Sequence, residues 1–238
     1  MNLKIYYIKY KTMYISLIFI IIILLLTYFY LKTNSVETFN NKDNLYYEGN
    51  SDKNSVAFAC NVDWGEEYIP QMLELFKENN INITFFVTGK WAEKNTELLK
   101  KMYDMGHEIG SHGYMHRNYG DLSYTLNLEE IKKADTIIAK IIGKKPLLFA
   151  PPSGSFNDAT IKAAEEENHK TIMWTVDTID WREDSTKDII IERVISKTKK
   201  NSIVLMHPKE ETLKALPIII NKLKEKNLSI EKVSNILK

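Results

Sequence analysis

The chain has 238 residues, of which 44% are hydrophobic and 26% charged, and its formal net charge is +1. This length allows one folded domain with a further segment, and the balanced charge gives no reason to expect a nucleic-acid partner. The single cysteine, Cys60, excludes a disulfide within the chain and a cysteine-based zinc site. Because Cys60 lies in an apolar run, we expect a buried thiol.

The first 31 residues predict a membrane anchor. Residues 1–13 contain three lysines, and residues 14–31 are almost all apolar. That run approaches the ~20 residues that cross a bilayer, and the basic excess ahead of it predicts a cytoplasmic N-terminus. A cleaved signal peptide is the alternative, but its apolar core is usually shorter, roughly 7–15 residues, and ends at a small-residue cleavage site. We therefore expect a single-pass signal-anchor helix over residues 14–31 in the cell membrane, with the remainder extracytoplasmic.

The rest of the chain predicts a linker and one α/β domain. Residues 32–54 are polar and asparagine-rich, as in a linker, and residues 55–238 show strand and helix patterns in alternation. Strand patterns cover residues 56–62, 81–87, 108–109, 147–149, 171–176 and 203–206, and helical patterns cover residues 68–78, 91–105, 128–142, 158–167, 189–199 and 213–224. Pro217 indicates a late start or a kink in the last helix. Such alternation predicts a parallel sheet with helical cover, closed or nearly closed into a barrel.

Polar residues follow five of these strands, where the chemistry of such barrels collects. They include Asp63, His112, Ser153, Asp180 and His207. His116 follows His112 by four residues, so both imidazoles would lie on one face of a helix, and paired imidazoles are favoured ligands for zinc and its neighbours. The sequence therefore predicts a metal-dependent hydrolytic site at this edge of the sheet.

In these motifs the chain resembles the polysaccharide deacetylase (NodB homology) family of carbohydrate esterases, from residue 55 to the C-terminus. Residues 61–65 correspond to the family's T-F-D-D-G motif, residues 84–89 to its Thr-Phe-Phe segment, and residues 112–116 to its His-x-x-x-His motif. Residues 150–154 correspond to R-P-P-x-G, residues 180–181 to D-W, and residues 205–207 to L-x-H. The resemblance implies a distorted (β/α)7 barrel and is strongest to a divergent subgroup associated with sporulation.

The resemblance also implies a role for each matching residue. His112, His116 and Asp63 would hold a divalent metal, zinc in the first place, with cobalt, nickel or manganese as alternatives. Asp63 would also be the catalytic base, His207 the general acid, and Asp180 the partner that orients His207. The substrate-binding residues would be Trp181, Pro152, Ser153 and Leu205, with the Ser153 N–H stabilising the oxyanion.

Two residues depart from the family pattern. Trp64 stands where the family has a metal-binding aspartate, and Ala150 stands where it has an arginine. In a second register Asn61 takes the position of the base and Asp63 that of the metal ligand, which is possible because residues 61 and 63 of a strand point to the same side. An asparagine cannot accept a proton at neutral pH, so the base would then come from another acid: Glu66, Glu67 or Asp177.

Two functions follow from this sequence. The first is a hydrolase of carbon–nitrogen bonds that removes N-acetyl groups from cell-wall or related polysaccharide with the help of the metal. The second is a catalytically impaired family member that acts as a membrane-anchored glycan-binding or scaffold protein. Both make an N-acetylated cell-wall glycan the partner, and neither predicts an oligomeric state.

Overall fold

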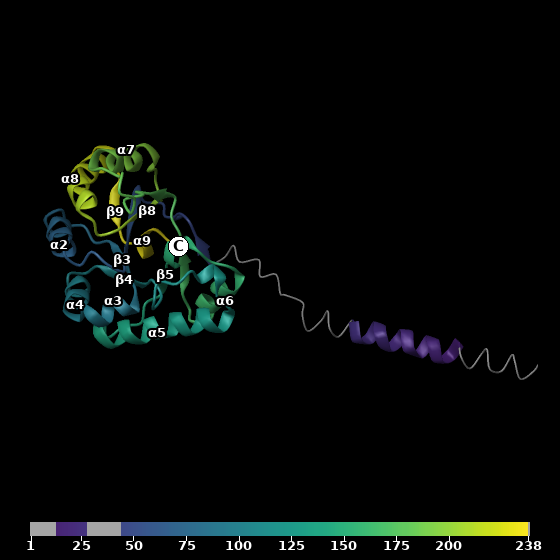
Figure 1. Cartoon of the computed structure of the whole chain (residues 1–238). Coiled ribbons are helices and arrows are strands. Elements are labelled where there is room, and N and C mark those ends of the chain that lie inside the picture. Colours follow the sequence, from purple (N-terminus) through teal and green to yellow (C-terminus); the bar gives the residue numbers. More distant parts are fainter. Residues whose placement is uncertain (1–12, 28–43, 238) are drawn as a thin grey trace, which may run out of the picture. The chain divides into compact units, whose positions relative to one another are not determined.

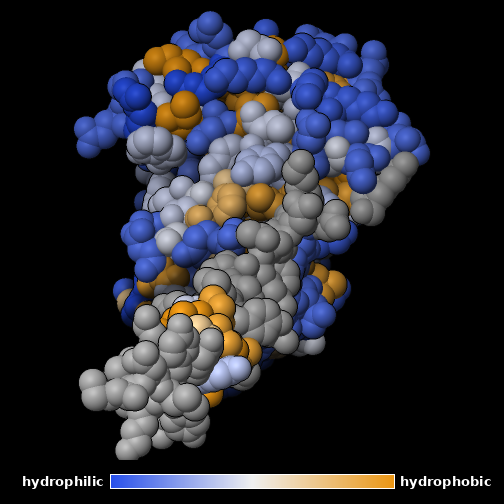
Figure 2. Space-filling model, turned by 90° about the vertical axis from the view of Figure 1, so that its right-hand side faces the viewer, coloured by the Kyte–Doolittle hydropathy of each residue, from blue (hydrophilic) through white to orange (hydrophobic). Residues whose placement is uncertain are grey.

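The computed structural model describes residues 13–27 and 44–237, and the chain divides into two compact units at residues 40 and 41 (Figure 1). Residues 13–27 form a helix whose large apolar side chains are exposed, and they give the hydrophobic surface coloured orange among grey atoms in Figure 2. No helix in the described part of the chain is both long and apolar enough to cross a membrane. Residues 1–12 and the end of the predicted span, residues 28–31, lie outside the described residues.

The second unit is built on a sheet in which all the strand pairings are parallel. Its strands run in the order β1-β6-β5-β4-β3-β2-β8-β7, and β9 pairs with the start of β2. The sheet curls into a half-barrel, since no pairing among the described strands joins β7 to β1. The bounds are β1 Leu45–Tyr46, β2 Ser55–Val62, β3 Thr84–Val87, β4 Glu108–Ser111, β5 Leu148–Phe149, β6 Lys170–Ile172, β7 Val176–Asp177, β8 Ile203–Met206 and β9 Ser229–Glu231.

Helices lie around the outside of these strands (Figure 1). They are α2 Ile69–Glu78, α3 Gly89–Lys94, α4 Thr96–Asp104, α5 Tyr124–Ile142, α6 Asp158–Glu166, α7 Lys187–Lys197, α8 Glu210–Glu225 and α9 Val233–Ile236. Local sequence fixes several ends: Ser123 accepts a hydrogen bond at the start of α5, left-handed Gly143 closes it, and Asn157 caps α6. The fold confirms the predicted helix-covered parallel sheet, with seven strands from β2 to β8 and two further strands, β1 and β9.

Strand β2 is buried along its whole length and holds the core together. Its side chains alternate between two apolar clusters. Phe58, Cys60 and Val62 belong to the larger one, which includes side chains of the outer helices, whereas Ala57 and Ala59 belong to a smaller one. The buried thiol expected for Cys60 is confirmed.

Several predicted elements have different bounds in the structure. The helix expected over residues 91–105 is two helices, α3 and α4, separated at Asn95, which has non-helical dihedral angles. The strand expected over residues 171–176 is divided into β6 and β7. Pro217 predicts a late start or a kink in the last helix; the late start is wrong, because α8 begins at Glu210 with Pro217 inside it. Two glutamates in its first turn favour this earlier start through the helix dipole.

The predicted linker, residues 32–54, overlaps the folded unit. Leu45 and Tyr46 form β1 and pair with β6, and the Gly49 N–H donates to the Asn201 carbonyl at 2.8 Å. A strand of two residues is too short to show an alternating apolar pattern in a polar sequence. β1 forms because its backbone pairs with β6, a partner that the local sequence does not reveal. Residues 32–43 lie outside the described part of the chain.

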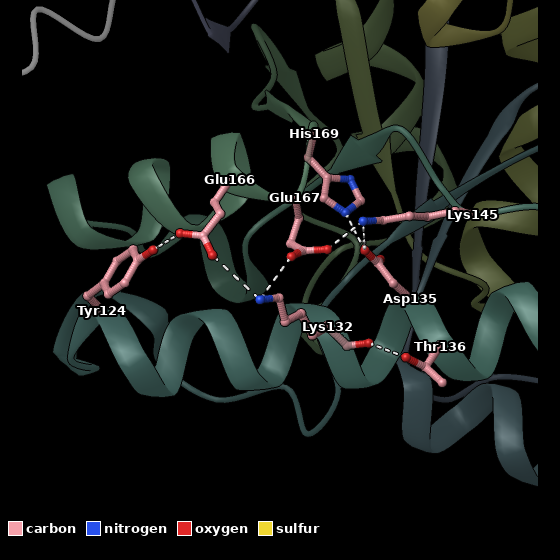
Figure 3. A network of polar contacts seen from close by, with 8 residues as sticks. All are labelled: Tyr124, Lys132, Asp135, Thr136, Lys145, Glu166, Glu167 and His169. Carbon is pink, nitrogen blue, oxygen red and sulfur yellow. Dashed lines mark hydrogen bonds and ion pairs between the residues drawn. The ribbon is translucent and has the colours of Figure 1, made fainter.

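A charged network joins α5 to the end of α6 and the start of β6 (Figure 3). At its centre the buried His169 ring contacts Asp135, with 2.8 Å between Nε2 and Oδ2. Lys145 lies 3.4 Å from Asp135 and 2.5 Å from Glu167, and Lys132 lies 3.3 Å from Glu167. The lysines are largely exposed, so the buried His169–Asp135 pair is the member that matters most for stability. His169 is buried in this pair and does not line the cleft described below, so its role is structural.

Candidate functional site

A cleft of about 480 Å³ opens at the carboxyl ends of the strands, where the sequence predicts the site. Its lining residues lie at or near the ends of six strands and are Asn61, Asp63, Trp64, His112, His116, Ser153, Trp174, Asp177, Trp181, Leu205 and His207. Most of the predicted site residues therefore meet here. Asp180 lies behind His207, and Pro152 is buried in the turn that presents Ser153.

The predicted helix between His112 and His116 is absent; these residues form a loop after β4. The loop bends at Gly113, with φ of 72°, and at His116, with φ of 53°. It still places the two imidazole rings edge to face, with 5.1 Å between their centroids. The two imidazole rings are therefore close together, as predicted. A loop with left-handed residues at Gly113 and His116 brings them together, in place of the predicted helix.

Three residues in loops at or near this cleft have left-handed backbone although they are neither glycine nor asparagine. In the described residues seven non-glycine residues have positive φ, and four of them are asparagines, which tolerate this conformation. The other three are His116, Ser153 and Ile179, and all lie in loops at the rim of the cleft or beside Asp180. A β-branched isoleucine has a real steric cost there, and such strain is typical of functional loops.

His112 is buried and presents one ring nitrogen to the cleft. Its Nδ1 lies 2.7 Å from the Ala150 carbonyl oxygen. A carbonyl only accepts, so Nδ1 carries the proton and Nε2 keeps its lone pair. Burial, with a further contribution from His116, lowers the pKa of His112 to about 3. The ring is therefore neutral near pH 7 and acts as an acceptor or a ligand through Nε2.

Asp63 is held in place by Thr88. The Thr88 hydroxyl donates to Asp63 Oδ1 at 2.7 Å, and the same hydroxyl oxygen accepts the Trp91 N–H at the start of α3. The helix start thus fixes the carboxylate that follows β2. Asp63 lines the cleft, and the bond from Thr88 leaves its Oδ2 unengaged.

His207 and Asp180 form a tightly bonded pair. Asp180 accepts three hydrogen bonds: from His207 Nδ1 at 2.7 Å, from the His207 N–H at 2.7 Å and from the Thr212 hydroxyl at 2.6 Å. Burial alone would raise the pKa of Asp180, but these bonds outweigh it and the pKa lies below its ordinary value. The carboxylate is therefore ionised and fixes the His207 tautomer, with Nε2 facing away from Asp180.

Trp64 stacks on His207. The two ring centroids are 5.8 Å apart and the planes differ by 12°, and Lys209 Nζ lies 5.9 Å from the indole ring of the same tryptophan. Trp64 is 40% exposed and lines the cleft, so part of the indole remains open to solvent at its rim.

The residues present do not fit a metal centre with three protein ligands. Trp64 provides no ligand atom, and Asp63 accepts a hydrogen bond from Thr88 through Oδ1, which leaves only Oδ2 unengaged by that bond. Within residues 13–27 and 44–237, no group of three or more His, Cys, Asp or Glu side chains is placed to hold a metal ion. In that part of the chain His112 and His116 are a pair of imidazoles without a third protein donor, which is fewer ligands than a hydrolytic metal site usually has.

The sequence missed one residue of the cleft and left another undecided. Trp174 lines the cleft and would contact any Cβ added at Gly154, at 2.8 Å. It lies in a segment with the pattern of a buried strand, so its apolar character indicated core rather than site. Asp177, one of the candidate bases, also lines the cleft, and its Oδ1 accepts the Ile179 N–H at 2.7 Å.

The fold and the cleft define a parallel-sheet carbohydrate esterase scaffold with histidines at the carboxyl ends of its strands. The family model for polysaccharide deacetylase matches residues 48–172. The chain is 33% identical over 194 residues to a Bacillus cereus peptidoglycan-N-acetylglucosamine deacetylase, covering 78% of this chain and 90% of that protein. The chain therefore belongs to the polysaccharide deacetylase family.

Two further relatives are relevant to a site that departs from the family pattern at Trp64 and Ala150. Bacillus subtilis (strain 168) YlxY, described as an uncharacterized protein, is 40% identical over 191 residues, which cover 80% of this chain and 60% of YlxY. The crystal structure of a CE4 family pseudoenzyme from Bacillus anthracis is 38% identical, with a TM-score of 0.79, and the match covers 82% of this chain and 69% of that one. A mutant of that pseudoenzyme, described as having restored enzymatic activity, matches with a TM-score of 0.79 at 36% identity.

Proposed function

We propose that the domain binds N-acetylated cell-wall glycan in the cleft and does not hydrolyse it at a rate typical of its family. The observation that carries this proposal is Trp64, whose indole stacks on His207 where the family has a metal-binding carboxylate. Metal-assisted hydrolysis needs an ion to polarise the acyl oxygen and to lower the pKa of a bound water. Two imidazoles without a third donor support neither task, whereas exposed indoles support sugar binding.

The glycan itself is inferred from chemistry and family. The rim of the cleft carries two exposed tryptophans, Trp64 at 40% and Trp181 at 55% exposure, and its walls are partly apolar. Exposed aromatic faces suit the apolar faces of sugar rings, and the polar groups deeper in the cleft suit an acetamide. The Bacillus cereus relative is named a peptidoglycan-N-acetylglucosamine deacetylase, which supports an N-acetylated wall glycan for this cleft.

A deacetylase is the second candidate, and the His207–Asp180 pair favours it. The pair has the geometry of a general acid held by a carboxylate, with 2.7 Å between Nδ1 and Oδ1. In that case the ligands would be His112, His116 and Asp63, and the metal, zinc or a neighbouring divalent ion, would activate the water.

Acetate release and binding separate the two candidates. The full-length chain in detergent is assayed for acetate release from N-acetylglucosamine oligomers and peptidoglycan, with and without added Zn²⁺ or Co²⁺, and for oligomer binding by calorimetry. We expect binding without acetate above the blank, and binding that persists in His207→Ala. Acetate release that disappears in both Asp63→Ala and His207→Ala would instead establish the deacetylase.

We also propose that the domain is held at the outer face of the cell membrane by residues 14–31. The support is the sequence: an apolar run that follows three lysines. A wall-glycan ligand lies on that side of the membrane, which makes the proposed binding and the proposed location consistent with each other.

A further inference from the structure

Asn61 has a buried oxygen that nothing in the described chain satisfies. It lies next to the end of β2, opposite Phe86 of β3, and only 4% of the residue is exposed. Its Oδ1 has no hydrogen-bond partner among the residues that the structure describes. Since side chains alternate along a strand, Asn61 points away from the cluster that contains Cys60 and Val62, and it lines the cleft.

An unpartnered amide oxygen at this depth is costly, because it has lost its water without gaining a donor. Buried polar atoms are nearly always paired, so an exception needs an explanation. β2 is otherwise almost entirely apolar, and a leucine or valine would extend the core at this position. The cost is recovered if a ligand in the cleft supplies the missing donor.

We propose that Asn61 Oδ1 accepts the N–H of an acetamide group bound in the cleft, so that the chain recognises N-acetylated sugar by a hydrogen bond in place of a metal. This inference rests on the proposed function and names the residue that selects for the acetyl group. It differs from the role that the sequence suggested for Asn61, a replaced base, because recognition needs an acceptor and no proton transfer.

The layout of the cleft favours the acetamide over a sugar hydroxyl as the donor. Asn61 and His112 are buried, at 4% and 1% exposure, whereas Trp64 and Trp181 at the rim are 40% and 55% exposed. A sugar ring stacked on the rim indoles keeps its hydroxyls near water. The acetamide is the substituent that projects from the ring with both a donor N–H and an apolar methyl, and Leu205 provides an apolar wall inside the cleft.

The test compares two β-1,4-linked tetrasaccharides that differ only in the acetamide: the N-acetylglucosamine tetramer and the glucose tetramer. Calorimetry on the full-length chain in detergent measures both affinities for the wild type and for Asn61→Leu, which keeps the volume and removes the amide. Ser55→Ala is the matched control, because Ser55 lies on the same strand with a buried, unpartnered hydroxyl but does not line the cleft.

We expect Asn61→Leu to weaken binding of the N-acetylglucosamine tetramer roughly tenfold, the value of one ordinary hydrogen bond, and to leave binding of the glucose tetramer unchanged. Ser55→Ala should change neither affinity. Because the substitution removes an unsatisfied polar atom, the melting temperature of Asn61→Leu should not fall. Should this variant fold poorly, Asn61→Ala removes the same amide without adding bulk or a new acceptor, and the same tenfold loss is expected.

Three results would contradict these proposals in different ways. If the wild type binds neither tetramer, the proposed function fails. If the wild type binds the N-acetylglucosamine tetramer and Asn61→Leu or Asn61→Ala binds it equally well, the role of Asn61 is wrong while the proposed function stands. Equal losses for the two tetramers would mean that Asn61 accepts a sugar hydroxyl, which overturns the assignment to the acetamide.

Discussion

At the scale of single residues, two histidines at opposite ends of β4 show how position decides what an imidazole does. His107 precedes the strand and His112 follows it, and both are buried. His107 Nδ1 accepts the Ile83 N–H at 3.2 Å, whereas His112 Nδ1 donates to the Ala150 carbonyl at 2.7 Å. The rings of Phe76 and Phe85 pack edge to face with the His107 ring, so its role is structural.

His107 makes stability depend on pH. Burial lowers its pKa to about 4 in the folded chain, with a smaller lowering from Lys232, while the unfolded chain keeps the ordinary pKa of about 6.5. Between these values the unfolded state binds more protons, so stability falls as the pH falls from about 6.5 to about 4. The loss is up to ~1.4 kcal/mol per pH unit for one such group.

The substitution His107→Asn keeps an acceptor for the Ile83 N–H and does not titrate. We expect it to reduce the pH dependence of the unfolding free energy by about one proton between pH 4 and 6.5. Urea unfolding followed by tryptophan fluorescence measures this, because Trp64, Trp91, Trp174 and Trp181 are all four tryptophans of the chain and lie in the folded unit. His112 titrates over a similar range in both proteins and cancels in the comparison. If His107→Asn leaves the pH dependence of the unfolding free energy unchanged, the pKa of His107 is not lowered in the folded chain.

At the scale of elements, the loop from His112 to His116 depends on a glycine. Gly113 has φ of 72°, and a Cβ there would lie 1.9 Å from the Tyr119 hydroxyl oxygen. Tyr119 is fully buried, so its ring cannot move aside cheaply. The glycine therefore both permits the left-handed turn and makes room for a core side chain under the site.

Gly113→Ala should destabilise the domain more than Gly143→Ala does. Gly143 has φ of 74°, but nothing in the described chain lies within 4 Å of the position that an added methyl group would take, so Gly143→Ala carries only the left-handed penalty of roughly 1–2 kcal/mol. The clash at Gly113 adds a further ~1–3 kcal/mol. Urea unfolding of both variants checks the order, and binding of the N-acetylglucosamine tetramer should weaken in Gly113→Ala alone. Equal destabilisation would contradict the close contact with Tyr119.

At the scale of the whole molecule, the described residues of the two units differ in the hydropathy of their surfaces. The helix over residues 13–27 exposes large apolar side chains, whereas the face of the folded unit visible in Figure 2 is mainly hydrophilic with scattered hydrophobic residues. A chain of this kind suits a domain that works in water while its N-terminal segment partitions into lipid, which is the arrangement proposed above.

Fractionation tests the anchor. The full-length chain should stay with membranes after carbonate extraction, and Ile22→Arg, which places a charge within the apolar run, should release a large part of it because a charge at the centre of a bilayer costs ~2.5–3.5 kcal/mol on insertion scales. Protease added outside spheroplasts should digest the folded domain. Ile189→Arg is the matched control, since Ile189 is an exposed isoleucine of the folded unit. Release of the unaltered chain by carbonate would rule the anchor out.

Local sequence was enough to define the helix-covered parallel sheet and the positions where the site lies. Alternating apolar patterns are set by local chain geometry, and polar residues that interrupt them at strand ends are visible without coordinates. The departures at Trp64 and Ala150 were equally visible, because they are single substitutions within recognisable motifs.

How those residues use their positions depends on tertiary packing. The spacing of His112 and His116 predicts a helix, but the left-handed turn depends on Gly113 packing against Tyr119, which is close in space and not predictable from local pattern. The stacking of Trp64 on His207 brings the residues after β2 against a loop far along the chain, and the burial of the Asn61 oxygen without a partner depends on the elements packed around it. Contacts of this kind depend on how whole elements pack together, so they cannot be predicted from the sequence of one strand.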